Sequence, residues 1–309
     1  MSENLVIVES PGKIKKISDS LGKDYEVKAS IGHIRDLPAD KLSVDVDGSF
    51  EPTYVIPADK QKVVAELKAA ARKAKTVWLA SDEDREGEAI SWHLFETLDL
   101  DKAKTRRIAF HEITKPALEA AIKHPRTVDM DMVASQQARQ TLDMLVGFDL
   151  SGIVRKKVPG AISAGRVQSP ALRLVVEKER EIEKFNKKSS YKVAGKFGSP
   201  EFSATLDKIS PENKEEAENL LNLLSGSKFR VKDLEKTEGS KANPVPFSTA
   251  SLQIEANARL GFSSKTTMRA AQALYQAGKI TYHRTDSLNL SEQAIAAIAS
   301  YIENNFGRE

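Results

Sequence analysis

The sequence predicts a multidomain protein that begins with an α/β domain, in which helices flank a parallel sheet. Residues 1–125 alternate short apolar runs with helical patterns, which is typical of such a sheet. Residues 126–185 show helical periodicity almost throughout, and residues 186–240 return to short runs that predict strands. The length of 309 residues also favours two or three domains over one.

In the α/β region, strands and helices are expected to follow one another in a regular order. The expected strands are Leu5–Val8, Tyr25–Ser30, Thr76–Ala80 and Arg107–Phe110. The expected helices are one that ends near Leu21, then Lys60–Arg72, Gly87–Leu98 and Pro116–Ile122. Residues 36–57 break this rhythm with three prolines and several acids, so they predict an excursion from the sheet.

Beyond this region the chain changes character twice more. Helices are expected at Val133–Val146 and Gln168–Phe185, joined by a glycine-rich turn. The following region is expected to hold three strands and one helix, namely Tyr191–Gly198, Glu201–Leu206, Phe229–Lys236 and the helix Glu212–Leu224. A linker at Thr237–Asn243 leads into residues 246–309, which are mainly helical, with interruptions at Gly261, Gly278 and Ile280–Thr285.

The composition excludes several classes of protein. The chain has no cysteine, which excludes a disulfide scaffold and a cysteine-ligated zinc site. No apolar run reaches the roughly 18–20 residues of a membrane span, and Leu5–Val8 is too short for a signal-peptide core. The net charge is only +3, so the positions of the charges say more than their sum. We expect a cytoplasmic protein with no membrane partner.

Asp82, Asp84, Glu86 and Glu88 form an acidic cluster between an expected strand and an expected helix. Residues two apart in an extended chain point the same way, so Asp82, Asp84 and Glu86 can share one side. Glu9 also follows a strand, and ligands of open α/β sheets bind outside these strand ends. Oxygen ligands suit Mg²⁺, so the cluster predicts a magnesium site. The alternative is that the acids only cap the helix and complement its dipole.

The loop Ser10-Pro11-Gly12-Lys13 follows Glu9 and is expected to open a helix, where phosphate groups bind readily. Pro-Gly is also common in ordinary turns, so this signal is weak by itself. The G-x-x-x-x-G-K-[ST] spacing of a nucleotide-binding loop is missing from it, and we expect no ATP.

Positive charge is concentrated in Arg155–Lys188, whose net charge is +6. Within it, the segment Ser163-Ala164-Gly165-Arg166-Val167-Gln168-Ser169 combines small residues with hydrogen-bond donors. Small residues let a backbone approach closely, and Arg166 and Gln168 can then bind phosphates or base edges. For residues 177–188 a solvated helix face with Glu–Lys pairs is the better interpretation.

Tyr282 is the candidate nucleophile, since tyrosine can form covalent intermediates. Its phenol has an ordinary pKa of about 10, so it needs nearby positive charge at neutral pH. Arg284 is expected on the same side of an extended segment, where it can stabilise a phenolate and a pentacoordinate phosphate. The alternative is a core tyrosine in a strand, and the neighbouring His283 is assigned no chemistry.

Together these segments resemble the type IA DNA topoisomerases, most closely the bacterial topoisomerase I group. The similar segments are Glu9–Lys13, Asp82–Glu88, Phe110–Pro116, Ser163–Ser169 and Tyr282–Ser287. The first two match the opening of the family and the Asp-x-Asp-x-Glu motif of its Toprim domain. Phe110–Pro116 resembles the form found in topoisomerase I rather than in topoisomerase III. The last two match the S-A-G-R-V-Q-S run and the active-site Y-x-R-T-D-S motif of the family. Their order and joint presence make the resemblance specific, and they span nearly the whole chain.

The resemblance implies that Tyr282 attacks a phosphodiester of single-stranded DNA, forming a 5′-phosphotyrosyl link and freeing a 3′-hydroxyl. Because one ester replaces another, resealing needs no ATP. Arg284 and Lys13 are expected to stabilise the transferring phosphate, and Glu9 to carry a proton near the leaving oxygen. The expected Mg²⁺ ligands are Glu9, Asp82, Asp84 and Glu86, and no zinc is expected.

The resemblance also implies a DNA-binding surface. The expected contacts are His33, Arg139, Gln140, Asp143, Phe148, Arg155, Ser163, Ala164, Gly165, Arg166, Val167, Gln168 and Arg284. Gln140 stands where many relatives carry arginine, and Phe148 stands where the family is often aromatic. The expected substrate is a single-stranded segment of negatively supercoiled DNA in the bacterial nucleoid, bound by a monomer.

The same resemblance divides the chain into parts of four domains. Residues 1–35 and 58–128 are expected to form a Toprim domain, and residues 36–57 and 129–185 part of a helical DNA-binding domain. Residues 186–241 are expected to be the outgoing arm of a β-rich arch, and residues 242–309 the start of the tyrosine-bearing domain. The chain is expected to be the N-terminal part of a longer enzyme and to need the rest for strand passage.

Two other functions share some of these features. A Toprim primase or nuclease has the carboxylates but needs no tyrosine motif. A non-catalytic fragment that binds single-stranded DNA would show salt-sensitive binding without cleavage.

Overall fold

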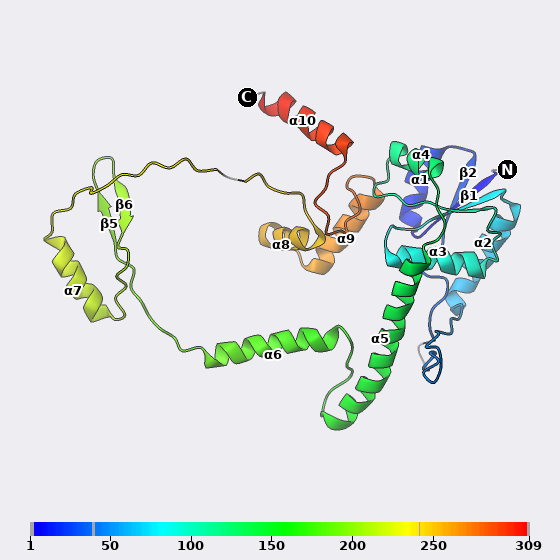
Figure 1. The fold of residues 1–309 in the computed structure, drawn as a ribbon, viewed down its shortest axis with the longest axis horizontal. Coiled ribbons are helices and arrows are strands. Elements are labelled where there is room, and N and C mark those ends of the chain that lie inside the picture. The colour runs from blue at the N-terminus through cyan, green and yellow to red at the C-terminus, as the bar shows by residue number, and fades with distance from the viewer. Residues whose placement is uncertain (1–2, 39–40, 241, 308–309) are drawn as a thin grey trace. The chain divides into compact units, whose positions relative to one another are not determined.

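The computed structural model describes residues 3–38, 41–240 and 242–307. The chain divides into two compact units, each described here by itself (Figure 1). The first unit is formed by Met1–Arg166 together with Pro244–Glu309, and the second by Val167–Asn243. The tyrosine motif and the N-terminal acids therefore belong to the same compact unit, although they lie far apart in the sequence.

A four-stranded parallel sheet forms the centre of the first unit. Its strands are β1 (Asn4–Val8), β2 (Tyr25–Ala29), β3 (Thr76–Ala80) and β4 (Thr105–Arg107), in the order β2-β1-β3-β4. The parallel sheet is confirmed, but the expected last strand, Arg107–Phe110, overlaps β4 only at Arg107. Ile108 and Phe110 follow β4 and are buried, so their apolar side chains indicate that they belong to the core and not that they pair in the sheet.

The alternation of side chains along the strands builds one core on each face of the sheet. Leu5 and Ile7 pack with helices α2 (Gln61–Lys73) and α3 (Arg85–Thr97). Val6 and Val8 lie in the opposite core, with α1 (Ile14–Leu21) and α4 (Lys115–Lys123). Both faces are thus covered, as the near-continuous apolar strands predict.

The remaining helices of the first unit come from both of its sequence segments. They are the short 3-10 helices η1 (Pro11–Lys13) and η2 (Ala58–Lys60), and the helices α5 (Met130–Lys157), α8 (Thr249–Leu260), α9 (Ser264–Gln276) and α10 (Glu292–Phe306). The expected helix Val133–Val146 was too short, because α5 continues through Gly147 and Gly152. A glycine inside a helix costs only about 1 kcal/mol, too little to end a helix of 28 residues. None of the helices in the described ranges is long and apolar enough to cross a membrane.

The second unit contains α6 (Gln168–Lys184), the antiparallel pair β5 (Ala194–Phe197) and β6 (Phe202–Thr205), and α7 (Lys214–Ser225). The expected strand Phe229–Lys236 is wrong, since the structure assigns no strand to it. Its alternating pattern fits a strand, but a strand requires a hydrogen-bonding neighbour. Phe229 instead packs its ring against Phe197, with 4.9 Å between the ring centroids. The assignment of this region to an arch stays a prediction.

Candidate active site

The candidate site lies where the order of the parallel strands reverses. The chain passes from β1 outward to β2 on one side, whereas β3 and β4 lie on the other side of β1. In open α/β sheets, ligands bind at such a switch point, outside the carboxyl ends of the strands. Glu9 directly follows β1, and Ser81 and Asp82 directly follow β3. Glu9, Ser81 and Asp82 therefore lie at the same edge of the sheet, because β1 and β3 are neighbours.

A cavity of about 390 Å³ opens at this place. All four predicted metal ligands line it, namely Glu9, Asp82, Asp84 and Glu86. The other lining residues come from the N-terminal loop, from α9 and from the tyrosine segment, namely Ser10, Met268, Arg269, Gln272, Gln276, Tyr282, His283 and Arg284. The structure therefore brings the nucleophile candidate and the acids around a common space.

The acids at the cavity also bind donors from the protein. Asp82 is ion-paired with Lys13. Asp84 is the N-cap of α3: its Oδ1 accepts a hydrogen bond from Gly87 N at 2.8 Å, and its Oδ2 accepts one from the Tyr282 hydroxyl. Glu86 is paired with Arg139 at 2.7 Å. Helix capping, the alternative considered for these acids, is therefore true of Asp84, which nevertheless faces the cavity.

The donor set suits a hard cation, since four carboxylates line the cavity. Burial, and next the charge of Asp82, raise the pKa of Glu9. This is the expected cost of gathering carboxylates in a partly closed space, and a bound cation relieves it. Within the described part of the chain, no three acidic or histidine side chains lie close enough together to hold a metal ion. The types of side chain at the cavity fit Mg²⁺, but in this arrangement the carboxylates point to donors of the protein itself.

Tyr282 is buried, with 7% of its surface exposed. Its segment is anchored by backbone contacts: Tyr282 N donates to His111 O at 2.7 Å, and Thr249 Oγ1 donates to the carbonyl of His283 at 2.7 Å. Burial, and next the hydrogen bond to Asp84, raise the pKa of the Tyr282 phenol above its usual value. The charge of Arg284 lowers it but is the smaller effect. The resting phenol is therefore protonated and already bonded to a possible base.

Arg284 and Lys13, the two predicted phosphate-stabilising cations, occupy different environments. Arg284 lines the cavity, and its Nη1 lies 4.0 Å from Asp84 Oδ2 while most of its side chain stays exposed. Lys13 is fully buried; its Nζ is paired with Asp82 and lies 5.3 Å from the centre of the Tyr275 ring. Arg284 is thus open to the cavity, whereas Lys13 does not line it and contacts only its wall residue Asp82.

A chain of ion pairs runs from the cavity along α5. Glu86 binds Arg139, Arg139 lies 3.8 Å from Asp143, and Asp143 accepts a 2.6 Å hydrogen bond from Arg166. His33 joins the same group through Nε2, which lies 3.4 Å from Glu86. The structure thus joins four of the predicted DNA contacts in one group of ion pairs that starts at the cavity acid Glu86.

The other predicted DNA contacts are more scattered. Gln140 donates to Asp36 at 2.8 Å, Phe148 is exposed, and Arg155 donates to the carbonyl of Ser151. The hydroxyl of Ser151 bonds both the N–H and the carbonyl of Ala164, which shapes the loop that also holds Ser163 and Gly165. Val167 and Gln168 belong to the second unit.

Comparison with known families decides the identity of the chain. A family model described as DNA topoisomerase matches residues 127–309, and the Toprim domain model matches residues 4–113. This chain belongs to the bacterial type IA DNA topoisomerase family. It is similar to full-length topoisomerase I from Thermotoga maritima, with 40% identity and a TM-score of 0.87 over 98% of this chain. It spans 53% of that protein, about half of its length.

Several residues that line the cavity were not predicted from the sequence. Met268, Arg269, Gln272 and Gln276 all come from α9, one helix before the tyrosine segment. Their spacing of three and four residues gives the only signal that they share one helix face. Tyr275, from the same helix, lies beneath the cavity and donates to Asp82.

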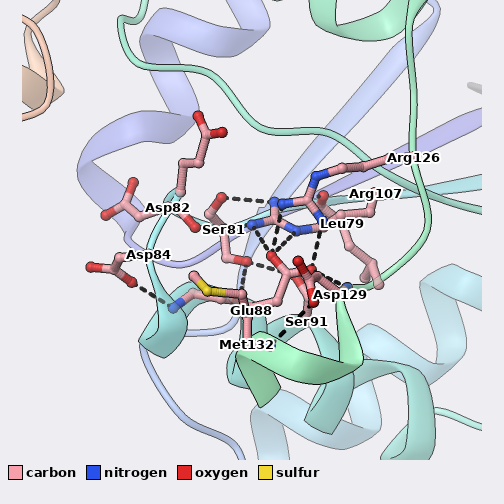
Figure 2. A network of polar contacts seen from close by, with 12 residues as sticks. Leu79, Ser81, Asp82, Asp84, Glu88, Ser91, Arg107, Arg126, Asp129 and Met132 are labelled. Carbon is pink, nitrogen blue, oxygen red and sulfur yellow. Dashed lines mark hydrogen bonds and ion pairs between the residues drawn. The ribbon is translucent and has the colours of Figure 1, made fainter. Parts of the chain in front are cut away.

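Glu88, Arg107 and Arg126 form a largely buried ion network beside Ser81 and Asp82 (Figure 2). Glu88 accepts hydrogen bonds from Arg107, from Arg126 at 2.8 Å and from the backbone N–H of Asp129 at 2.8 Å. Arg107 also donates to the carbonyls of Ser81 and Asp82, both at 2.9 Å. Burial acts to raise the pKa of Glu88, but Arg126 and Arg107 outweigh it, and the pKa is lowered. Glu88 is therefore a charged structural residue and not a cavity acid.

Proposed function

We propose that this chain carries the DNA-cleavage centre of a type IA topoisomerase. Tyr282 attacks a phosphodiester of a single strand, its phenol oxygen bonds to phosphorus, and the bond to the 3′ oxygen breaks. The products are a 5′-phosphotyrosyl link and a free 3′-hydroxyl, and the reverse attack reseals the strand without ATP. The observation that carries the proposal is the Tyr282 hydroxyl bound to Asp84 in an acid-lined cavity.

The proton movements follow from the environments of the two acids. Asp84 already accepts the Tyr282 hydrogen bond, so it is placed to receive the phenol proton as the attack proceeds. Glu9 has a raised pKa because of burial and the charge of Asp82, so it retains a proton more readily and supplies it to the leaving 3′ oxygen. Arg284, which lines the cavity, stabilises the charge that develops on the phosphate. Lys13 contributes its charge from below through Asp82.

Magnesium belongs to this proposal. Asp82, Asp84 and Glu86 would hold it together with Glu9 in its deprotonated form, because these are the carboxylates that line the cavity; Glu9 would carry a proton only while it is not bound to the cation. When bound, Mg²⁺ supplies positive charge beside the transferring phosphate. Replacing Asp82 and Asp84 together by alanine is expected to weaken Mg²⁺ binding and resealing. Magnesium binding and resealing that both survive this double change would contradict the assignment.

The substrate we propose is a single-stranded segment of negatively supercoiled DNA, bound by a monomer in the cytoplasm at the bacterial nucleoid. The DNA contacts carried into the proposal are His33, Arg139, Gln140, Asp143, Phe148, Arg155, Ser163 to Gln168, and Arg284. The supporting observation is the ion-pair chain from Glu86 to Arg166, whose two arginines can exchange carboxylates for phosphates. Relaxation of supercoils by the whole enzyme is part of the same proposal.

The decisive experiment is capture of the covalent adduct on single-stranded DNA. The 309-residue chain is mixed with an oligonucleotide and Mg²⁺, denatured and resolved on a gel. An oligonucleotide labelled at its 3′ end should become protein-linked, whereas one labelled at its 5′ end should be released with a free 3′-hydroxyl. Tyr282→Phe should abolish the adduct, and Tyr301→Phe, an exposed tyrosine, should not.

The alternatives give different patterns in the same assay. Cleavage that persists in Tyr282→Phe indicates a Toprim nuclease. Salt-sensitive binding without cleavage by the wild-type chain indicates a DNA-binding fragment. An adduct on another side chain of a complete enzyme would overturn the assignment of Tyr282.

A further inference from the structure

A second tyrosine, Tyr275, lies directly beneath the cavity and has no role in the reaction proposed above. It belongs to α9 and is fully buried, within the same apolar core as β1 and β3. Its ring packs edge-on against Tyr282, with 5.2 Å between the centroids. Its hydroxyl lies 3.3 Å from Asp82 Oδ1 and 3.5 Å from the carbonyl of Phe110, so it donates toward the acid end of the core.

The contact falls on a carboxylate oxygen that is already bonded. Lys13 and Tyr275 both donate to Oδ1 of Asp82. Because Lys13 and Tyr275 are both buried and both bind Oδ1 of Asp82, they also fix the direction in which Oδ2 of Asp82 points. Such outer contacts are the usual way in which a protein orients a metal ligand before the metal arrives.

Tyr275 reaches Asp82 only while its helix is docked on the N-terminal segment. Gln276 Nε2 donates to Ser10 Oγ at 3.1 Å, and Tyr282 N donates to His111 O. Between them, Gly278 has φ of +67°, and a Cβ there would lie 2.7 Å from the carbonyl of Ile113. Only a glycine allows this close approach, so the turn after α9 is seated against the α/β domain.

We propose that Tyr275 is a positioning residue for Asp82, and that it makes the direction of this carboxylate depend on docking of the segment that carries Tyr282. The inference rests on the proposed function, because Asp82 is taken as a Mg²⁺ ligand. Its consequence is that the direction of the Asp82 carboxylate depends on whether the segment that carries the nucleophile is docked.

The test uses Tyr275→Phe, which keeps the ring and removes only the hydroxyl. Titration calorimetry of the 309-residue chain with Mg²⁺ should show about tenfold weaker binding, as for other changes in such outer contacts. The Mg²⁺ concentration for half-maximal resealing should rise by the same factor, while the adduct still forms on Tyr282. Tyr301→Phe is the matched control and should behave as the wild type.

A double-mutant cycle separates positioning from a general loss of packing. If Tyr275 acts through Asp82, adding Tyr275→Phe to Asp82→Asn should leave the remaining Mg²⁺ affinity unchanged. A further loss of affinity in the double variant overturns the inference, and so does wild-type affinity in Tyr275→Phe alone. A wild-type chain that binds no Mg²⁺ and forms no adduct instead overturns the proposed function, together with this inference.

Discussion

The acid-lined cavity and the largely buried ion network around Glu88 differ sharply, although Glu86 and Glu88 lie only two residues apart. Glu86 has 31% of its side chain exposed and is bound at the cavity by Arg139 and His33. Glu88 has 1% exposed and is bound by Arg107, which is fully buried, and by Arg126, whose side chain is 40% exposed. The difference arises because α3 begins directly after Asp84, so Glu86 and Glu88 both lie in its first turn. Residues two apart point the same way in a strand but to opposite sides of a helix.

One acidic motif thus serves two purposes at once. The extended part, Asp82 and Asp84, presents carboxylates to the cavity, where Lys13 pairs with Asp82 and Arg284 lies 4.0 Å from Asp84. The helical part buries Glu88 against Arg107, whose other donors hold the carbonyls of Ser81 and Asp82. The closed network thus stabilises the loop whose open side carries the proposed chemistry.

The largest expected effect on stability comes from breaking the closed network. Glu88→Ala leaves two guanidinium groups without their common partner, which should lower the free energy of unfolding by about 3–5 kcal/mol. Glu86→Ala should lower the free energy of unfolding by less than about 1 kcal/mol, because the ion pairs of Glu86 are partly exposed. Urea unfolding of the two variants measures the contrast. Equal losses would remove the distinction between the two regions.

The two regions should also respond oppositely to pH. The pKa of Glu88 is lowered in the folded state, so its stabilisation is present above the unfolded-state pKa and is lost as the pH falls through the folded value. The pKa of Glu9 is raised, so its contribution is present at low pH and is lost as the pH rises through the folded value. Glu9→Gln should therefore stabilise the chain at neutral pH, and Glu88→Gln should destabilise it there. Thermal unfolding between pH 4 and pH 8 checks both signs.

Within the cavity, Glu86→Gln should change function more than stability. It removes one charge from the acids proposed to hold Mg²⁺ and releases Arg139. We expect resealing of the captured adduct to require more Mg²⁺, with unfolding nearly unchanged. An unaltered Mg²⁺ requirement in single-turnover resealing would exclude Glu86 from the proposed metal site.

The smallest expected effect concerns the ion-pair chain on α5. Arg139→Gln should leave the fold intact, since both partners of the Glu86 pair are partly exposed. If Arg139 contacts a phosphate, its loss should reduce the slope of log affinity against log salt by about 0.7 for single-stranded DNA. Fluorescence anisotropy at several salt concentrations measures this slope, and Arg173→Gln, whose pair with Glu177 is exposed, is the control.

The parallel sheet, most helix positions, the family resemblance and the candidate chemistry could be predicted from the amino-acid sequence, because all of these depend on local periodicity and short motifs. The folded chain was needed to show which acids face the cavity, that Lys13 pairs with Asp82, and that Tyr275 donates to the same carboxylate. These features join residues up to 193 positions apart, and no local pattern encodes such a contact. The strand expected at Phe229–Lys236 failed for the same physical reason, since its pattern is local but a strand needs a partner from elsewhere in the chain.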